Sequence, residues 1–528
     1  MRRLGLLFTV FLVVASCATT QQRGQALVGL AIDGMGGVQS LAGVKNYAVK
    51  GTVRQWEPEQ SLVPGGEPRF AGESSFTSAT DVAAGATRID WTRNFAYPAP
   101  RTFTFTEIVT AEAGYVAGID SNGRNKQSQE SNPPAHSMSG VRVATFQREA
   151  RRSSPLLLLD MQRQPDRINQ LGDTVVGSTS YPTVEYRAPE ALYLVMFDRV
   201  TTLPARIRTL DYDNMWGDIT YDLVLSDWQV LDGVRVATTQ RHELNGRLVQ
   251  ETKIADFKKN ITIGAGQLVV PDAYRAGAAR AATADVPYQW VLRRQAIGVY
   301  LDSENPSYDT KAATGLRLND LGPGLSHAIG GTHHSLVVEM KDYVVVFDAP
   351  ISDRQSNLVL SAIRAKYLRK PVKYLVLTHH HMDHAGGLRA YAAEGATLVV
   401  GRGAAAHYRR VLAAPYSRNA DLTEKSLTGT QIVEVADKWS VSDGTREVQA
   451  YLVENPHSDA FLIGYVPSAR LGYVTDIWSP GPPLPAQLTP LQVALVTGVK
   501  KVGITPEKFA GGHGGVADYA PLAERAGN

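Results

Sequence analysis

The sequence has little cysteine, little net charge and few long apolar segments. A single cysteine among 528 residues rules out a disulfide within the chain, so the fold must depend on buried apolar area or on metal. The formal net charge of +3 is small for this length, and no long basic run or internal repeat is visible, so no nucleic-acid partner is indicated. An apolar content of 44% and a charged content of 20% are typical of globular proteins, and the length allows two or three domains.

An apolar segment of twelve residues, Leu4 to Ala15, follows Arg2-Arg3 at the N-terminus. It is too short to span a bilayer but fits the apolar region of a secretory signal. It leads into Ser16-Cys17 and resembles a bacterial lipoprotein signal, in which cleavage before the cysteine leaves an N-terminal residue that carries lipid. We therefore expect residues 1–17 to be a signal peptide. The protein would then be exported to the periplasm of a bacterium and anchored to a membrane through lipidated Cys17. A plain signal peptide with an incidental cysteine is the alternative.

Residues 27–275, which follow an expected polar tether at residues 18–26, mostly alternate apolar and polar side chains. Asp232-Gly233 and Asn245-Gly246 are tight-turn dipeptides between such alternating runs. The pattern predicts an antiparallel sheet with one solvated face. Short helices are expected near Leu27–Ala42 and Leu156–Gln170.

Within this region, Phe197-Asp198, Leu203–Arg206, Tyr221 and Asp232-Gly233-Val234 resemble the strand-and-turn pattern of periplasmic lipoprotein-carrier folds. Those folds are curved antiparallel half-barrels that shelter acyl chains. The resemblance therefore implies a half-barrel for residues 27–275. A generic β domain that positions the rest of the chain is the alternative.

The pattern changes after residues 276–292, which are rich in alanine and are expected to form a linker. In residues 293–528 strands alternate with helices, so this part is predicted to be an α/β domain. Ser335–Met340 and Tyr343–Phe347 form a predicted hairpin, and Asn357–Tyr367 has the apolar spacing of a helix. Ten of the twelve histidines lie beyond residue 320, so the candidate chemistry is concentrated here.

The stretch Thr378–Gly387, with the sequence THHHMDHAGG, is the most informative in the chain. It follows the apolar run Tyr374–Leu377, a predicted buried strand, and sites in α/β sheets lie at such strand ends. Alternation in an extended segment would point three metal-binding side chains the same way and His380 the opposite way, and a fourth would come from the following turn. These four candidate metal ligands are His379, His381, Asp383 and His384. A surface histidine tract is the alternative.

Two metal sites need more ligands than this loop provides. His457 and Asp476 each follow a predicted strand, and His513 lies among glycines, where a backbone can approach a metal closely. Each has an ordinary alternative, as a turn residue, a helix cap or a loop donor. Because His457, Asp476 and His513 follow the histidine loop in this order, we expect all of them to belong to the same metal site.

That order resembles the metallo-β-lactamase superfamily, whose fold is an αββα sandwich. The resemblance covers about residues 293 to 528 and implies two bound metal ions. One ion would be held by His379, His381 and His457, the other by Asp383, His384 and His513, with Asp476 as the bridge. Asp348 resembles the family's structural acid that supports the ligand loop. Asp476 stands where several true β-lactamases have Cys or Ser, and His381 where di-iron members have Glu. This favours two zinc ions, with manganese and iron as alternatives.

The resemblance implies an enzyme in which a metal-bridging hydroxide attacks the substrate and Asp383 orients it. We therefore expect an exported binuclear zinc hydrolase that cleaves an ester, thioester, lactone or lactam in a small molecule. Hydrolysis of β-lactams proper is one alternative. A second, of another class, is a lipid- or peptide-binding module in which the metal domain is a scaffold. The proline-rich segment Trp478–Pro490 is expected to be a lid over the metals or a rigid connector.

Overall fold

The computed structural model describes residues 18–121, 135–275, 288–299, 302, 312, 315–368, 370–418 and 427–527. The expected signal peptide with Cys17, and most of the expected linker, lie outside the described residues. Among the helices that are described, none is both long enough and apolar enough to cross a bilayer.

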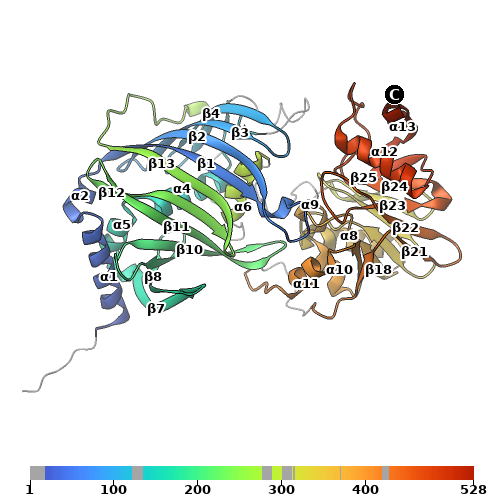
Figure 1. The fold of residues 1–528 in the computed structure, drawn as a ribbon, viewed down its shortest axis with the longest axis horizontal. Coiled ribbons are helices and arrows are strands. Elements are labelled where there is room, and N and C mark those ends of the chain that lie inside the picture. Colours follow the sequence, from blue (N-terminus) through green and yellow to red (C-terminus); the bar gives the residue numbers. More distant parts are fainter. Residues whose placement is uncertain are drawn as a thin grey trace, which may run out of the picture.

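The N-terminal part is built around one antiparallel sheet of thirteen strands, in the order β6-β5-β4-β3-β2-β1-β13-β12-β11-β10-β9-β8-β7. The order arises because the first and last strands of this region, β1 and β13, pair with each other and join two meanders. The strands are β1 Asn46–Glu57, β2 Arg69–Asp81, β3 Ala86–Phe95, β4 Arg101–Val109, β5 Gly114–Gly118, β6 Ala135–Ser137, β7 Ile168–Val176, β8 Thr179–Arg187, β9 Leu192–Phe197, β10 Pro204–Asp213, β11 Gly217–Leu231, β12 Val234–Leu244 and β13 Arg247–Lys259. Figure 1 shows this sheet curving around helices. The predicted antiparallel sheet is confirmed.

Helices cover the concave face and one end of this sheet (Figure 1). They are α1 Thr20–Gly34, α2 Val38–Ala42, α4 Gly140–Ser153, α5 Leu157–Arg163 and α6 Tyr288–Ile297, with 3-10 turns η1 Pro58–Gln60, η2 Pro165–Arg167 and η3 Asp272–Tyr274. Three expectations differ from this arrangement. Most of the expected tether is helical, because Thr19 and Gln22 form a capping box that starts α1 at Thr20. The helix expected over Leu156–Gln170 ends at Arg163, and α4 was not predicted.

The C-terminal part is a sandwich of two sheets between helices, which confirms the predicted αββα arrangement. The first sheet has the order β14 Arg317–Gly322, β15 Leu325–Ile329, β16 Ser335–Glu339, β17 Val344–Phe347, β18 Val372–Val376, β19 Thr397–Gly401, β20 Ile432–Val435. The second has the order β21 Lys438–Ser442, β22 Glu447–Leu452, β23 Leu462–Val466, β24 Leu471–Val474, β25 Lys508–Gly511, β26 Val516–Asp518. Side chains such as Phe347, Leu336 and Tyr473 fill the space between the sheets.

The outer faces of the sandwich are covered by helices that bury their own apolar sides. The first sheet packs with α8 Asp353–Lys366, α10 Leu388–Ala393 and α11 Ala405–Ala413, and the second with α12 Pro490–Val502 and α13 Ala520–Gly527. A short helix, α9 Met382–Ala385, lies in the histidine loop, and η5 Pro467–Ala469 joins β23 to β24.

Helix α6 spans residue 293, where the sequence analysis predicts the start of the α/β domain. Arg293, in the middle of α6, is 2% exposed and forms ion pairs with Glu57 of β1 and Asp213 of β10. The helix is therefore tied to the N-terminal sheet by ion pairs, while its Trp290 packs in the core cluster of the α/β part.

Candidate metal centre

The histidine loop follows strand β18 and leads into the short helix α9. His381 is the N-cap of α9, so Asp383 projects from a helical turn instead of continuing the extended segment as predicted, whereas His384 comes from that turn as predicted. Gly386 and Gly387 allow the chain to pass close to the start of α8. A Cβ at Gly387 would collide with the Ser356 hydroxyl and the Ser352 carbonyl.

All seven predicted metal ligands come together in two groups. In each group, one nitrogen or oxygen atom per residue lies within 4.8 Å of the others. The first group is His379, His381, His457 and Asp476, and the second group is His333, Asp383, His384 and His513. His380 is in neither group; its ring contacts the hydroxyls of Ser61 at 3.1 Å and Ser458 at 3.3 Å.

The imidazole nitrogens in these groups are spaced as ligands of one ion are. The Nε2 atoms of His379 and His457 are 3.3 Å apart, and those of His384 and His513 are 3.2 Å apart. Two ligands at about 2.0–2.1 Å from a tetrahedral Zn²⁺ would lie about 3.3 Å from each other. The donor spacing therefore fits a metal ion in each group.

In His381 the candidate ligand atom is Nδ1, whereas in the histidines above it is Nε2. Nε2 of His381 donates to the carbonyl oxygen of Ser61 at 3.0 Å, while its Nδ1 is buried and has no hydrogen-bond partner. A buried nitrogen without a partner is costly, and a cation would satisfy it. The hydrogen bond to the carbonyl of Ser61 thus leaves Nδ1 of His381 as the atom that could bind a metal ion.

Asp476 touches histidines of both groups. Its Oδ2 lies 3.0 Å from Nε2 of His379 and 3.1 Å from Nε2 of His384, and its Oδ1 lies 2.8 Å from Nε2 of His513. Its backbone φ is +48°, in the left-handed region that a non-glycine residue rarely adopts and that clusters at functional sites. This position fits the bridging role that the resemblance implied.

Asp348 supports the loop, as predicted. Its carboxylate is fully buried and accepts hydrogen bonds from the Thr378 backbone N–H at 2.7 Å and the Thr378 hydroxyl at 2.9 Å. Its Oδ2 also lies 3.2 Å from Nδ1 of His384, which fixes that ring with Nε2 towards the second group.

Burial keeps the rings of His379 and His381 in the neutral form that binds metal. Burial lowers the pKa of His379 to about 4 and the pKa of His381 well below its ordinary value, so both are neutral at pH 7. His384 differs: burial opposes its charge, but the carboxylates of Asp476 and Asp383 outweigh burial and raise its pKa.

The N-terminal domain contributes to this centre, which the sequence did not reveal. Gln60 of η1 donates from Nε2 to Oδ1 of Asp383 at 3.0 Å and accepts a hydrogen bond from the hydroxyl of Tyr97. Arg69 donates to the carbonyl oxygen of His457 at 2.5 Å and stacks over the Tyr97 ring. These residues lie more than 300 positions from the ligands they contact, and no local pattern marks them.

His333 is the other residue that the sequence analysis missed. Its Nε2 lies 3.4 Å from Oδ2 of Asp383, and its ring packs against His513 with the ring centroids 4.3 Å apart. A histidine-rich run at His333-His334, just before β16, was the available signal. The carboxylate of Asp383 is therefore held by His333 on one oxygen and by Gln60 on the other.

The segment Trp478–Pro490 begins as a packed connector. Trp478 is 4% exposed and lies against Phe509, with the ring centroids 5.9 Å apart. The carbonyl of Pro480 accepts from the N–H of Gly515 at 2.6 Å. Trp478 is thus part of the core beside the His513 loop, as expected for the rigid-connector alternative at this end of the segment.

A third group of metal-ligand type residues lies far from this centre. It consists of Asp120, His136 and Asp302. Here the guanidinium of Arg142, 1% exposed, donates to Asp120 at 2.7 Å, to Asp302 at 2.8 Å and to Glu107 at 2.6 Å. A cation is already in place, so this group is an ion-pair cluster.

Comparison with known proteins agrees with the fold and the site. Residues 328–513 match the model of the metallo-beta-lactamase superfamily, and this range contains all seven predicted ligands. Residues 328–513 are therefore similar to the metallo-beta-lactamase superfamily, and the two candidate ligand groups lie within this matched region or, for His513, at its last residue. No curated protein matches the chain.

Several solved structures are similar to part of the chain. A metallo-beta-lactamase from Pontibacter korlensis is 18% identical over 40% of this chain and 99% of its own, with a TM-score of 0.30. The stereoselective inverting sec-alkylsulfatase from Pseudomonas sp. is 15% identical over 41% of this chain, with a TM-score of 0.31, and the match spans 42% of the sulfatase. The flavodiiron protein from Giardia intestinalis is 15% identical over 40% of this chain and 58% of its own, with a TM-score of 0.30.

Proposed function

We propose that the C-terminal domain is a binuclear zinc hydrolase that cleaves an ester, thioester, lactone or lactam in a small molecule. The observation that carries the proposal is the pair of ligand groups joined by the carboxylate of Asp476. Six imidazoles and two carboxylates suit zinc, with manganese and iron as alternatives. Two cations held there would lower the pKa of a shared water and polarise the substrate carbonyl.

The side chains around the centre hold the reacting groups in place. Asp383 lies at the second group, where its carboxylate can accept a hydrogen bond from the attacking water and orient it. Gln60 and His333 each contact one oxygen of that carboxylate and so limit its rotation. Asp348 does the same for the ring of His384.

The hydroxyl of Tyr97 lies at the same edge of the centre. Burial raises its pKa, and the negative charges of Asp383 and Asp476 raise it further, so the phenol stays protonated. It can therefore donate a hydrogen bond, which it gives to Gln60 in this structure. The side chains that face the substrate would thus come from both domains.

Replacement of Asp383 by Asn tests the proposal. Asp383→Asn should keep most of the bound metal, because seven ligand-type residues remain, yet lower kcat about 10²–10⁴-fold, the usual contribution of a positioned acid–base group. Asp459→Asn is the matched control, because Asp459 is an exposed carboxylate two residues from His457. Metal content would be measured by elemental analysis. Full turnover in Asp383→Asn would remove the assigned role.

A substrate panel separates the carbonyl classes. Aryl esters, thioesters, lactones and nitrocefin would be compared at saturating zinc, with metal-free protein as the blank. Preference for nitrocefin would favour the β-lactamase alternative. Failure of every substrate in metal-loaded protein would contradict the hydrolase proposal.

We also propose export and membrane anchoring through lipidated Cys17. The support is the sequence of residues 1–17, an apolar segment that leads directly to the single cysteine. Labelled palmitate fed to cells should be incorporated into the wild-type chain and not into Cys17→Ser. Equal labelling of the two would contradict anchoring at this residue.

A further inference from the structure

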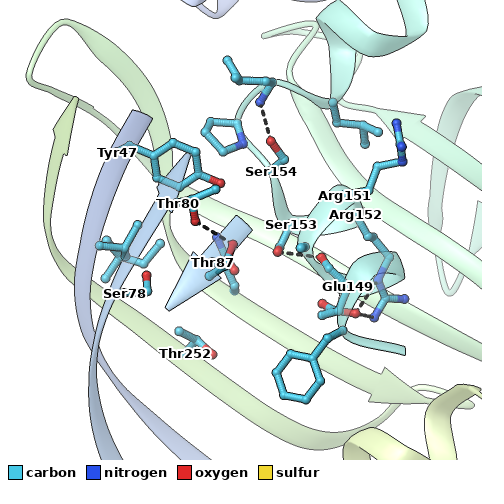
Figure 2. Close-up of a pocket in the computed structure, with 18 of the residues that line it drawn as sticks. Tyr47, Ser78, Thr80, Thr87, Glu149, Arg151, Arg152, Ser153, Ser154 and Thr252 are labelled. Carbon is cyan, nitrogen blue, oxygen red and sulfur yellow. Dashed lines mark hydrogen bonds and ion pairs between the residues drawn. The ribbon is translucent and has the colours of Figure 1, made fainter. Parts of the chain in front are cut away.

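The N-terminal domain contains a cavity of about 690 Å³ between the concave face of the sheet and helices α4 and α5 (Figure 2). Its volume lies within the range of about 300–1,000 Å³ that is usual for small-molecule sites. The metal centre is formed by residues 333–513, none of which lines this cavity. The cavity is therefore a separate feature of the molecule.

Apolar side chains form most of the wall. They project inward at alternate positions of the strands and from the helices that cover them, as with Val49, Phe76, Ile89, Phe146, Leu156 and Ile254. Smaller polar groups, including Ser78, Thr80 and Thr252, lie among them along the strands (Figure 2). A ligand that fills this space must be largely apolar, because only apolar surface gains from this wall.

Two polar side chains of the lining have N–H groups without acceptors. Arg93 of β3 is 2% exposed, and its Nε has no hydrogen-bond partner. Gln295 of α6 is 7% exposed, and its Nε2 has none either. The two residues contact each other, because Arg93 donates to the carbonyl oxygen of Gln295 at 2.8 Å. Unmet donors at buried positions cost free energy that an oxygen-bearing ligand would recover.

The guanidinium of Arg93 also has no direct ion-pair partner among the described residues. It rests on the rings of Trp91 and Phe105. Glu107, the neighbouring acid, is engaged by Arg142 and by the indole N–H of Trp91. Burial lowers the pKa of Arg93 to about 10, so it remains a cation at neutral pH.

The other buried charges of the lining are paired within the protein. Glu149 lies 2.9 Å from Arg152 and 2.7 Å from His242. Arg151 pairs with Asp160 at 3.0 Å and with Glu190 at 2.5 Å. Within the described part of the chain, Arg93 is therefore a buried cation of this cavity without a direct ion-pair partner.

We propose that this cavity binds a single-chain carboxylate amphiphile, with its acyl chain along the apolar wall and its carboxylate accepting hydrogen bonds from Arg93 and Gln295. The site is independent of the metal centre and does not require the proposed hydrolase activity.

Dodecanoic acid and its methyl ester are the probes, titrated calorimetrically into the full-length protein. Dodecanoate should bind at one equivalent per chain, and more tightly than the ester, because the ester lacks the charge. Arg93→Gln should weaken dodecanoate binding about tenfold or more, as expected for a hydrogen bond to a charged group, and leave the ester unchanged. Arg93→Lys should restore part of the preference for the acid. Equal binding of acid and ester to the wild type would overturn the head-group assignment.

Filling the cavity tests its location. Ser78 lines the cavity, whereas Thr77, its neighbour on β2, faces solvent. Ser78→Phe should abolish binding of both probes, and Thr77→Phe should bind them like the wild type. Circular dichroism and thermal midpoints identify any variant that fails to fold, in which case Ile89→Trp replaces Ser78→Phe. Undiminished binding in a folded, cavity-filled variant would place the ligand elsewhere and overturn the proposal.

Discussion

The metal centre and the Arg142 cluster both bury carboxylates beside histidine, but they differ in what balances the negative charge. In the Arg142 cluster one guanidinium donates to Glu107, Asp120 and Asp302. At the metal centre the described residues provide no Arg or Lys within ion-pair distance of Asp383 or Asp476, and imidazole nitrogens face the two carboxylates instead. The proximity of Asp and His alone therefore does not identify a metal site. A buried nitrogen without a partner, such as Nδ1 of His381, supports a metal site when it lies among other ligand atoms.

The largest difference between the clusters should appear in Asp476→Asn and Asp120→Asn. Asp476→Asn removes the charge that joins the two ligand groups, so we expect loss of at least one metal equivalent and a fall in turnover of about 10³-fold or more. Asp120→Asn should leave the metal content unchanged. Elemental analysis and steady-state kinetics on both variants give the answer, and metal loss in Asp120→Asn would end the distinction drawn between the clusters.

Arg142→Met should lower the stability of the fold and leave metal binding and turnover intact, the reverse of the result expected for Asp476→Asn. Removal of this guanidinium leaves buried carboxylates unpaired, and such a change typically destabilises by about 3–5 kcal/mol. Metal content and turnover per folded molecule should stay at wild-type values. Denaturant unfolding would measure the loss. The exposed pair of Arg88 and Asp90 provides the control, because Arg88→Met should cost no more than about 1 kcal/mol.

Gln60→Ala should have a smaller effect, limited to catalysis. Loss of the hydrogen bond to Asp383 frees that carboxylate, and substitutions of such supporting residues typically cost about 10–100-fold in activity. KM and metal content should change less than kcat. Gln229→Ala, at an exposed position of β11, is the control. A kcat equal to that of the wild type would show that the β domain does not orient Asp383.

The smallest expected effect is on thermal stability. It concerns Asp353, a buried carboxyl group that is neutralised by a proton instead of by imidazoles or a guanidinium. Burial raises the pKa of Asp353 to about 7, from 3.8 for an unperturbed aspartate. The folded chain then binds the extra proton between these pH values, so this group's stabilisation is complete at low pH and is lost as pH rises to about 7. Asp353→Asn should abolish this dependence and raise the thermal midpoint at pH 8 by about 2–4 °C, the shift that about 1 kcal/mol produces in a domain of this size. An unchanged midpoint at pH 8 would contradict the assigned protonation.

Much of the site could be predicted because its chemistry is encoded locally. His379, His381, Asp383 and His384 lie within six positions after a strand, so spacing alone brought them together. Asp476 and His513 needed the family resemblance, because each is a lone residue in the sequence. Gln60 and Ser61 were out of reach, since their contacts depend on how two separately folded regions dock.

The predicted helices differ from the structure where a local signal competes with the average composition of the segment. The capping box of Thr19 and Gln22 is visible in the sequence, but the polar composition of residues 18–26 favours a tether over a helix. Helix α4 has a polar average composition, because Arg142 and Arg152 are buried through ion pairs instead of apolar contact. A pattern of apolar residues cannot reveal burial of that kind.

The carbonyl of Ser61 has a consequence for how this protein can vary. The segment after η1 would ordinarily tolerate insertions and deletions, as other connections between strands do. Here one backbone oxygen in it decides which nitrogen of His381 is free. Adding or deleting a residue between Gln60 and Arg69 would move that oxygen, so the length of this connection should be as restricted as the identity of the metal ligands themselves.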